Sequence, residues 1–199
     1  MTKITTKFTA LLLMLTLCFA FLASCSEDAS TGGDDDNSQS EDGGSGSKPN
    51  TNYGSKIGYM ATPYTLERIG SDETVNIKNY RGKVVVLNFW GIWCEPCRNE
   101  LPDFDRVAAE NDDVVIIAVH TYNDSDGAEG YVDANFPDSK IIFAYDIPQI
   151  GKQDMYYQML GGEGSYPYTV ILDAEGKIVA KFTGSMSHDR LLDAINSAR

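Results

Sequence analysis

The sequence predicts an α/β protein whose mixed central sheet is covered by helices on both faces. Residues 114–119 are a continuous apolar run, and residues 84–89 are apolar on both faces apart from Asn88, as expected of strands that are buried on both sides. Segments with helical spacing of apolar residues alternate with such strands along the chain. The length of 199 residues and the apolar content of 42% indicate one globular domain with additional segments rather than two full domains.

The predicted elements follow one another without an internal repeat. Two strands, at 64–67 and 74–77, flank the polar turn 70–72 and predict an N-terminal hairpin. Next come a strand at 84–89, a helix starting near Cys94, a strand at 114–119, a helix at 127–136, a strand at 140–144 and a helix at 150–160. A tight turn at 173–176 joins strands at 168–172 and 177–183, and Ser187 can cap a final helix. The helix residues expected to face the core are Leu101, Phe104, Val107, Ala108, Tyr131, Val132, Leu191, Leu192 and Ile195.

Residues 1–24 have the features of a bacterial lipoprotein signal peptide. Lys3 and Lys7 precede an apolar run at 8–23 that is too short to span a bilayer as a helix. Small residues then lead into Cys25, a pattern that resembles the lipobox where signal peptidase II cuts and the cysteine is acylated. Lipid chains on Cys25 would attach the protein to the bilayer. The alternative is an ordinary secretory signal that leaves Cys25 as a free thiol.

Residues 25–50 are expected to comprise the lipidated cysteine and a disordered tether. After Cys25 this segment holds seven acidic residues and one lysine, and Gly and Ser make up most of the rest. It cannot bury enough apolar surface to offset the loss of chain entropy, so residues 51–199 form the predicted folded domain. The charges of the whole chain sum to 16 − 29 = −13, which argues against nucleic acid as a partner.

Cys94 and Cys97 are separated by two residues, a spacing shared by three kinds of site. Zinc would need two more ligands, and the domain offers only His120 and His188, which are not paired at the spacing of zinc-binding motifs. His120 ends a predicted strand, has no evident partner and is interpreted as structural. A permanent disulfide across two residues closes almost no loop and would constrain the unfolded chain little. A reversible dithiol beside a βαβ pattern is therefore the favoured interpretation.

The position of the pair predicts different roles for the two cysteines. Cys94 falls at a helix N-terminus, where unpaired amides and the helix dipole stabilise a thiolate. A thiol of pKa about 8.5 is only ~3% ionised at pH 7, whereas a thiol of pKa about 7 is half ionised. Cys97 lies one turn further on and points back towards Cys94, and Pro96 occupies the first turn, where its N–H is not required. Cys94 is thus the predicted attacking thiol and Cys97 the resolving thiol.

The segment 88–97, Asn-Phe-Trp-Gly-Ile-Trp-Cys-Glu-Pro-Cys, resembles the TlpA/ResA branch of the thioredoxin superfamily. Members of this branch are membrane-tethered thiol–disulfide oxidoreductases of the bacterial cell envelope. The resemblance extends from about residue 60 to the C-terminus and includes the turns at 82–83, 173–177 and 183–184. It implies a thioredoxin-like fold with a core sheet of four or five strands, an N-terminal β-hairpin and a central αβ insertion, for which residues 127–144 are the candidate.

The resemblance also assigns a proton-transfer role to Glu100, which follows Cys97 by three residues and shares its helix face. The alternative for Glu100 is a solvated acid on the helix surface. Asn88 stands where thioredoxin itself has a buried aspartate, which moves the acid–base role towards Glu100. Pro102 matches the proline that kinks the active-site helix of the family.

The dipeptide Tyr166-Pro167 matches the cis-proline that faces the disulfide in the superfamily and leaves a backbone edge for substrate. Tyr166 is then expected at the border of the substrate groove. Trp93, Glu95 and Pro96 are expected on the binding surface beside the attacking thiol.

The sequence therefore predicts an enzyme, a lipid-anchored thiol–disulfide oxidoreductase that acts on protein disulfides outside the cytoplasmic membrane. No metal or organic cofactor is required. The resemblance implies reduction of apocytochrome c or other envelope proteins, and re-reduction by a membrane thiol donor of the CcdA/DsbD type. The residues alone do not fix the direction of electron transfer. Two alternatives are a tethered binding module with a non-cycling disulfide, and a peroxiredoxin-like peroxidase, which would require Thr or Ser in place of Gly91.

Overall fold

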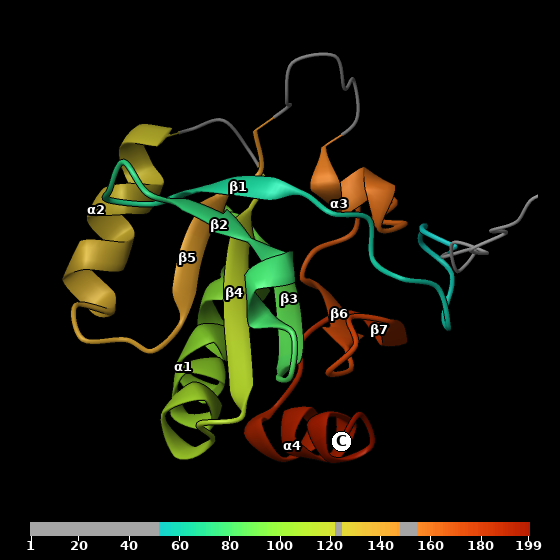
Figure 1. Ribbon diagram of the computed structural model, residues 1–199. Coiled ribbons are helices and arrows are strands. Elements are labelled where there is room, and N and C mark those ends of the chain that lie inside the picture. Colours follow the sequence, from blue (N-terminus) through green and yellow to red (C-terminus); the bar gives the residue numbers. More distant parts are fainter. Residues whose placement is uncertain (1–51, 122–124, 148–154) are drawn as a thin grey trace, which may run out of the picture. The chain divides into compact units, whose positions relative to one another are not determined.

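A seven-stranded mixed sheet forms the centre of the part of the chain that the computed structural model describes, residues 52–121, 125–147 and 155–199 (Figure 1). The strands are β1 (Thr65–Arg68), β2 (Thr74–Asn76), β3 (Val84–Trp90), β4 (Val114–His120), β5 (Ile142–Tyr145), β6 (Tyr168–Leu172) and β7 (Ile178–Thr183). Their order across the sheet is β2-β1-β5-β4-β3-β6-β7. Strands β3, β4 and β5 run parallel, and every other neighbouring pair is antiparallel.

Helical elements cover both faces of this sheet, as the sequence predicts. The elements are η1 (Ile77–Tyr80), α1 (Glu95–Glu110), α2 (Ser125–Asn135), α3 (Tyr156–Met159) and α4 (His188–Asn196). Successive side chains of β3 point to opposite faces, so Val84 and Val86 pack with α1, α2 and α4. Val85 and Leu87 pack on the other face with η1, α3 and the segment before β1. Burial on both sides is what the continuous apolar run of β3 requires.

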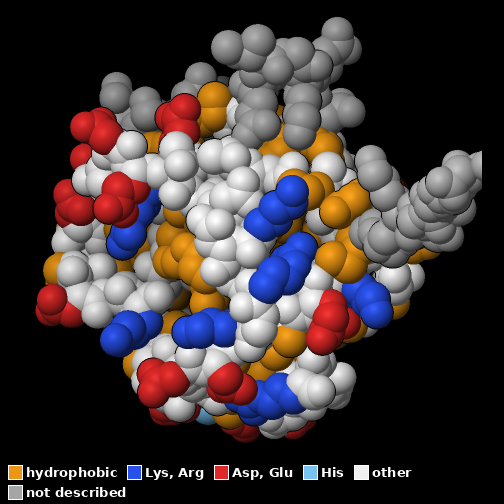
Figure 2. Space-filling model, in the orientation of Figure 1, with side chains coloured by type: hydrophobic (Ala, Val, Ile, Leu, Met, Phe, Trp, Pro, Cys, Tyr) orange, Lys and Arg blue, Asp and Glu red, His pale blue; other side chains and the backbone are white. Residues whose placement is uncertain are grey.

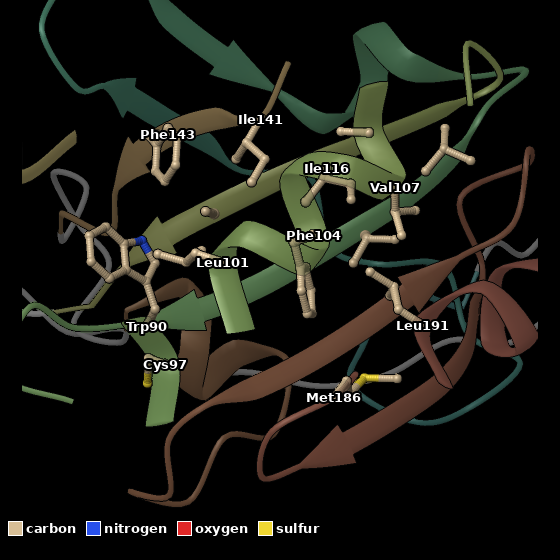
Figure 3. Packing of buried hydrophobic residues seen from close by; sticks show 14 of the residues in the cluster. Trp90, Cys97, Leu101, Phe104, Val107, Ile116, Ile141, Phe143, Met186 and Leu191 are labelled. Atoms are coloured by element: carbon tan, nitrogen blue, oxygen red, sulfur yellow. The ribbon is translucent and has the colours of Figure 1, made fainter. Parts of the chain in front are cut away.

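Helix α1 follows β3 after a loop of four residues and packs its apolar stripe on the sheet. Leu101, Phe104 and Val107 are fully buried there (Figure 3). Pro102 lies inside α1. Ser187 caps α4, since its hydroxyl accepts a hydrogen bond from the Arg190 N–H. The faces of α1 and α4 that were predicted to be buried therefore do pack on the sheet.

The predicted central insertion, residues 127–144, forms α2 and β5. β5 pairs with β4 on one side and with β1 of the N-terminal hairpin on the other. The inserted strand thereby joins the hairpin to the four core strands β4, β3, β6 and β7 in a single seven-stranded sheet. The predicted strands agree with the observed ones to within about two residues at each end.

Some predictions concern residues that the structure does not describe. Cys25, the signal peptide and the tether lie outside the described residues, and so does the first part of the helix predicted at 150–160. Within the described ranges that helix is the single turn α3. No helix in these ranges has both the length and the apolar character needed to cross a bilayer.

The surface carries charges of both signs. On the face shown in Figure 2, Lys and Arg side chains lie among the acidic ones. Large apolar side chains are exposed at three described positions, Tyr53, Ile57 and Trp93. Trp93 is the one that precedes the cysteine pair.

Candidate active site

Cys94 and Cys97 are joined by a disulfide bond at the N-terminus of α1. Cys94 is the N-cap residue, and its Sγ accepts a hydrogen bond from the Cys97 N–H at 3.3 Å. Pro96 lies in the first turn, where a helix offers no carbonyl partner for an N–H. Cys94 retains 5% of its surface and Cys97 retains none, so a sulfur atom of another protein can reach only Cys94.

The residues predicted for substrate binding surround Cys94. Trp93 is 55% exposed, and Glu95 and Pro96 are exposed on the other side of the cysteine. The Tyr166–Pro167 peptide bond is cis, as predicted. The Trp93 indole meets the Tyr166 ring edge-on, with 5.2 Å between the ring centres. This contact brings the residue before the cysteine and the residue before the cis-proline together, although they are far apart in the sequence.

Tyr166 rests on an aromatic base that extends into the core. Its ring is stacked on Tyr157 at 4.7 Å, and Tyr157 in turn meets Phe89 of β3 edge-on at 5.5 Å. Partial burial raises the pKa of Tyr166 above its ordinary value. Tyr166 therefore presents a neutral, partly buried ring to the surface beside the disulfide.

Gly91 allows the Trp93 side chain to fold back over the loop before α1. A Cβ atom at position 91 would lie 2.7 Å from the Trp93 indole, closer than real Cβ contacts permit. The same restriction bears on the peroxidase alternative, because a Thr or Ser side chain at this position would collide with the indole. With Gly at position 91, the chain has no side-chain hydroxyl where the peroxidase alternative requires one.

Two basic side chains hold the backbone of Ile92 in the same loop. The Ile92 N–H donates to Nε2 of His120 at 3.2 Å, and the Ile92 carbonyl accepts from the Arg98 guanidinium at 2.5 Å. His120 ends β4 and has a structural role, as predicted, but the prediction that it has no partner is wrong. Parallel pairing of β3 and β4 could have predicted this contact. His120 ends β4 directly beside Trp90 at the end of β3, and Ile92 follows two residues later. Nothing in the residue types indicated Arg98.

The Glu100 side chain is on the buried face of α1, since only 3% of the residue is exposed. The alternative of a solvated acid on the helix surface is therefore wrong. Oε1 of Glu100 accepts a hydrogen bond from Nδ2 of Asn88, and its Oε2 accepts one from the Met186 N–H, both at 2.8 Å. Burial raises the pKa of Glu100 to about 7, and the two hydrogen bonds oppose that shift. A carboxyl group of this pKa can both accept and release a proton near neutral pH.

Asn88 connects Glu100 to the strand that follows the cis-proline. Its Nδ2 also donates to Oγ1 of Thr169 at 3.1 Å, and the two residues are paired across β3 and β6. All three side chains are buried. The Asn88 Oδ1 atom has no hydrogen-bond partner among the described residues. Asn88 and Glu100 were predicted from the sequence to belong to the site, whereas Thr169 and Met186 were not.

A second buried carboxylate, that of Asp146, has a structural task. Its two oxygens accept hydrogen bonds from the N–H groups of Tyr156 and Tyr157 and so hold α3. Burial raises the pKa of Asp146. No group of three or more His, Cys, Asp or Glu side chains in the described part of the chain is placed to bind a metal ion.

Comparison with known proteins agrees with this geometry. The Redoxin family model matches residues 58–196. The thioredoxin-like protein YneN of Bacillus subtilis is 31% identical over 134 residues, 67% of this chain and 75% of that protein. The thiol–disulfide oxidoreductase ResA of Oceanobacillus iheyensis is 30% identical over 146 residues, 71% and 72% of the two chains.

A solved structure shows the same arrangement of elements. It is a protein of Chlorobium tepidum described as a thiol:disulfide interchange protein DsbE, with a TM-score of 0.61 and 23% identity. The match covers 72% of this chain and 97% of that one. The fold is thus thioredoxin-like, with the N-terminal hairpin and the central insertion that the sequence predicted.

Replacing Gly91 should release Trp93 from its fixed position. In Gly91→Ala the new methyl group must displace the indole, so its contact with Tyr166 is lost. Because Trp90 is fully buried, acrylamide quenching of tryptophan fluorescence reports on Trp93, and quenching should increase. Gly130→Ala is the matched control, since a Cβ there meets no atom within 4 Å, and it should leave quenching unchanged. Equal quenching in Gly91→Ala and wild type would contradict this account of the loop.

Glu100 should make the oxidised protein less stable as the pH rises. The pKa of about 7 in the folded protein lies above the ordinary value of 4.5, so the folded state holds the proton more tightly than the unfolded chain does. The stabilisation is complete below about pH 4.5 and is lost as the pH rises through about 7. Glu100→Gln has no such loss, and by pH 8 it should gain about 3 kcal/mol relative to wild type, measured by urea unfolding. Glu129→Gln, an exposed change on α2, should keep the wild-type pH dependence, and equal slopes for Glu100→Gln and wild type would refute the assignment.

Proposed function

Because the chain belongs to the Redoxin family and is a thiol–disulfide oxidoreductase, we propose that it reduces disulfide bonds of proteins outside the cytoplasmic membrane. One observation carries this proposal. The Cys94–Cys97 pair lies at a helix N-terminus with one accessible sulfur, and Glu100, with a pKa of about 7, is buried one turn further along the same helix face. Such a site has a nucleophile, a resolving thiol and a base for that thiol.

In the first step, the reduced Cys94 attacks the substrate as a thiolate. The N-terminal amides of α1 and the helix dipole stabilise this negative charge. A bond forms between Cys94 Sγ and one substrate sulfur, and the substrate S–S bond breaks. The other substrate sulfur leaves as a thiolate and takes a proton from water. Trp93 and Tyr166 offer the incoming chain an apolar, aromatic surface beside the reacting sulfur.

In the second step, Cys97 releases the substrate. Its thiol proton passes to the Glu100 carboxylate, and the resulting Cys97 thiolate attacks Cys94 Sγ. The Cys94–Cys97 bond forms and the mixed disulfide breaks, so the second substrate sulfur leaves with its electron pair and is protonated. Two electrons and two protons have then passed from the dithiol to the substrate disulfide.

The oxidised pair must be reduced again before the next cycle. The resemblance to TlpA/ResA proteins supports a membrane thiol donor of the CcdA/DsbD type for this task, and apocytochrome c or other envelope proteins as substrates. Only Cys94 has exposed surface, so donor and substrate would use the same sulfur in alternation. This exchange places the protein between a membrane reductant and its envelope targets.

We further propose that acylated Cys25 anchors the domain in the membrane. Support comes from the two lysines and the apolar run before Cys25 and from the small residues that lead into it. Two or more acyl chains give stable anchoring because each buried methylene contributes about 0.8 kcal/mol. As a flexible coil, the Gly/Ser-rich, acidic segment that follows would hold the domain at a root-mean-square distance of about 25–30 Å from the anchor.

Single cysteine replacements test the redox cycle. Cys94→Ser should abolish insulin disulfide reduction, because the accessible nucleophile is gone. Cys97→Ser should accumulate a mixed disulfide with the substrate, seen as a band on non-reducing gels that dithiothreitol removes. Retention of reductase activity by both variants would exclude this mechanism. A pair that fails to titrate with redox buffers in the physiological range would favour the binding-module alternative.

A change at Cys25 tests the anchor. Full-length wild type expressed in a bacterial host should sediment with the membrane fraction and incorporate labelled palmitate. Cys25→Ala should lose the label and appear in the soluble extracytoplasmic fraction, while its reductase activity stays at the wild-type level. If Cys25→Ala sediments like wild type, the anchoring proposal is wrong, whereas the redox function stands or fails on the cysteine replacements above.

A further inference from the structure

The two protonation states of Glu100 need different hydrogen-bond partners. As a carboxylate, Glu100 accepts from Asn88 Nδ2 at Oε1 and from the Met186 N–H at Oε2. When Glu100 takes up a proton on Oε1, that oxygen can still accept from the Asn88 N–H, but Asn88 in this orientation offers no acceptor for the new O–H. A buried donor without an acceptor costs about 1–3 kcal/mol, so this arrangement is unstable in a site without access to water.

The missing acceptor is already present on the same side chain. Oδ1 of Asn88 is buried and has no hydrogen-bond partner among the described residues. A half-turn of the amide about χ2 exchanges Oδ1 and Nδ2 with little change in shape, because the two atoms are nearly equal in size. After the half-turn Oδ1 faces two donors, the Glu100 O–H and the Thr169 hydroxyl, and the two N–H groups of Nδ2 move to the side where Oδ1 has no partner among the described residues.

We propose that Asn88 is a positioning residue whose amide turns by this half rotation when Glu100 takes up a proton. In one orientation Nδ2 donates to the carboxylate, and in the other Oδ1 accepts from the carboxylic acid. The inference rests on the proposed function, in which Glu100 receives the Cys97 proton. Asn88 then stabilises Glu100 both before and after that transfer.

The surrounding groups are compatible with this movement. The Thr169 hydroxyl accepts from Nδ2 in the present orientation, and after the half-turn it can rotate and donate to Oδ1. A backbone N–H has no such freedom, so Met186 continues to donate to Oε2. The proton would therefore settle on Oε1, the oxygen that faces Asn88.

The immediate surroundings of Glu100 contain no charge that would compete with this exchange. Asn88 of β3 and the Met186 amide from the segment between β7 and α4 donate to it, and Cys97 shares its face of α1 three residues earlier. Within the described residues, burial and these two neutral hydrogen bonds account for the shift of the Glu100 pKa. The orientation of the Asn88 amide is thus set by the Glu100 proton.

Nuclear magnetic resonance spectroscopy of the oxidised domain tests the rotation directly. At pH 9 the Asn88 side-chain amide protons should show strong cross-peaks to Thr169, and at pH 5 these cross-peaks should be absent. The pH at which their intensity falls by half should equal the midpoint of the Glu100 carboxyl titration. In Glu100→Gln the neutral side chain can donate to Oδ1, so the cross-peaks should be absent at both pH values. Cross-peaks that persist in wild type at pH 5 would overturn the proposal, and this arm needs no variant to fold.

The kinetic consequence is tested with Asn88→Leu and a matched control, Val86→Ala, on the same strand face. Asn88→Leu removes a strong hydrogen bond to the ionised form and a weaker one to the neutral form, so the midpoint of the pH–rate profile should rise by about one pH unit. The rate at pH 7 should fall about fivefold to tenfold. Val86→Ala, which opens a cavity in the same layer, should lower stability without moving the midpoint.

These experiments distinguish failure of the positioning role of Asn88 from failure of the proposed reductase function. A wild-type protein that reduces insulin with a pH-dependent rate, but whose midpoint is unchanged in Asn88→Leu, would exclude the positioning role alone. A wild-type protein without Cys94-dependent reduction would exclude the proposed function, and the cross-peaks to Thr169 would still decide whether the amide turns.

Discussion

Burial of the Glu100 carboxylate beneath α1 is the constraint on which the rest of the site depends. An isolated ionised carboxyl group without water is costly, and two hydrogen bonds to neutral donors offset only part of this cost. Donors from the middle of β3 and from the loop before α4 must therefore both be in place for the buried carboxylate to ionise near neutral pH in the folded protein. The pKa of about 7 expresses that balance, because a drier site would keep the proton and a wetter one would lose it.

The exposed side of the site is shaped by aromatic contacts rather than by charge. Trp93 is exposed, yet Gly91 below it and Tyr166 beside it hold its ring in one place. Tyr157 supports Tyr166 and contacts Phe89 in the core, so the surface is continuous with the sheet. A surface that is already ordered loses little conformational entropy when another chain binds.

Patterns carried within one element were enough to predict most of the fold. The runs of β-branched residues correctly predicted the central strands, and the position of Cys94 two residues before Pro96 correctly predicted where α1 starts. Contacts between distant residues were not predictable in this way. Asn88 and Thr169 are 81 residues apart and meet only because β3 and β6 pair in one register. The donor from Met186 is a backbone N–H, which every residue except proline possesses, so no residue type could reveal it. Nor could spacing decide whether Glu100 was buried or solvated.

The two cysteines are therefore activated by different physical means. Cys94 can ionise by itself, because the amides at the start of α1 lower the free energy of its thiolate whether or not substrate is present. Cys97 is fully buried, and burial disfavours its thiolate, so the proposed mechanism has Glu100 take its proton. An ionised Glu100 also opposes a second negative charge beside it, so charge can appear on Cys97 only as it disappears from the carboxylate. In the proposed cycle electron transfer from the pair is in this way tied to proton transfer, because the Cys94–Cys97 bond forms only as the mixed disulfide breaks and accepts the two electrons.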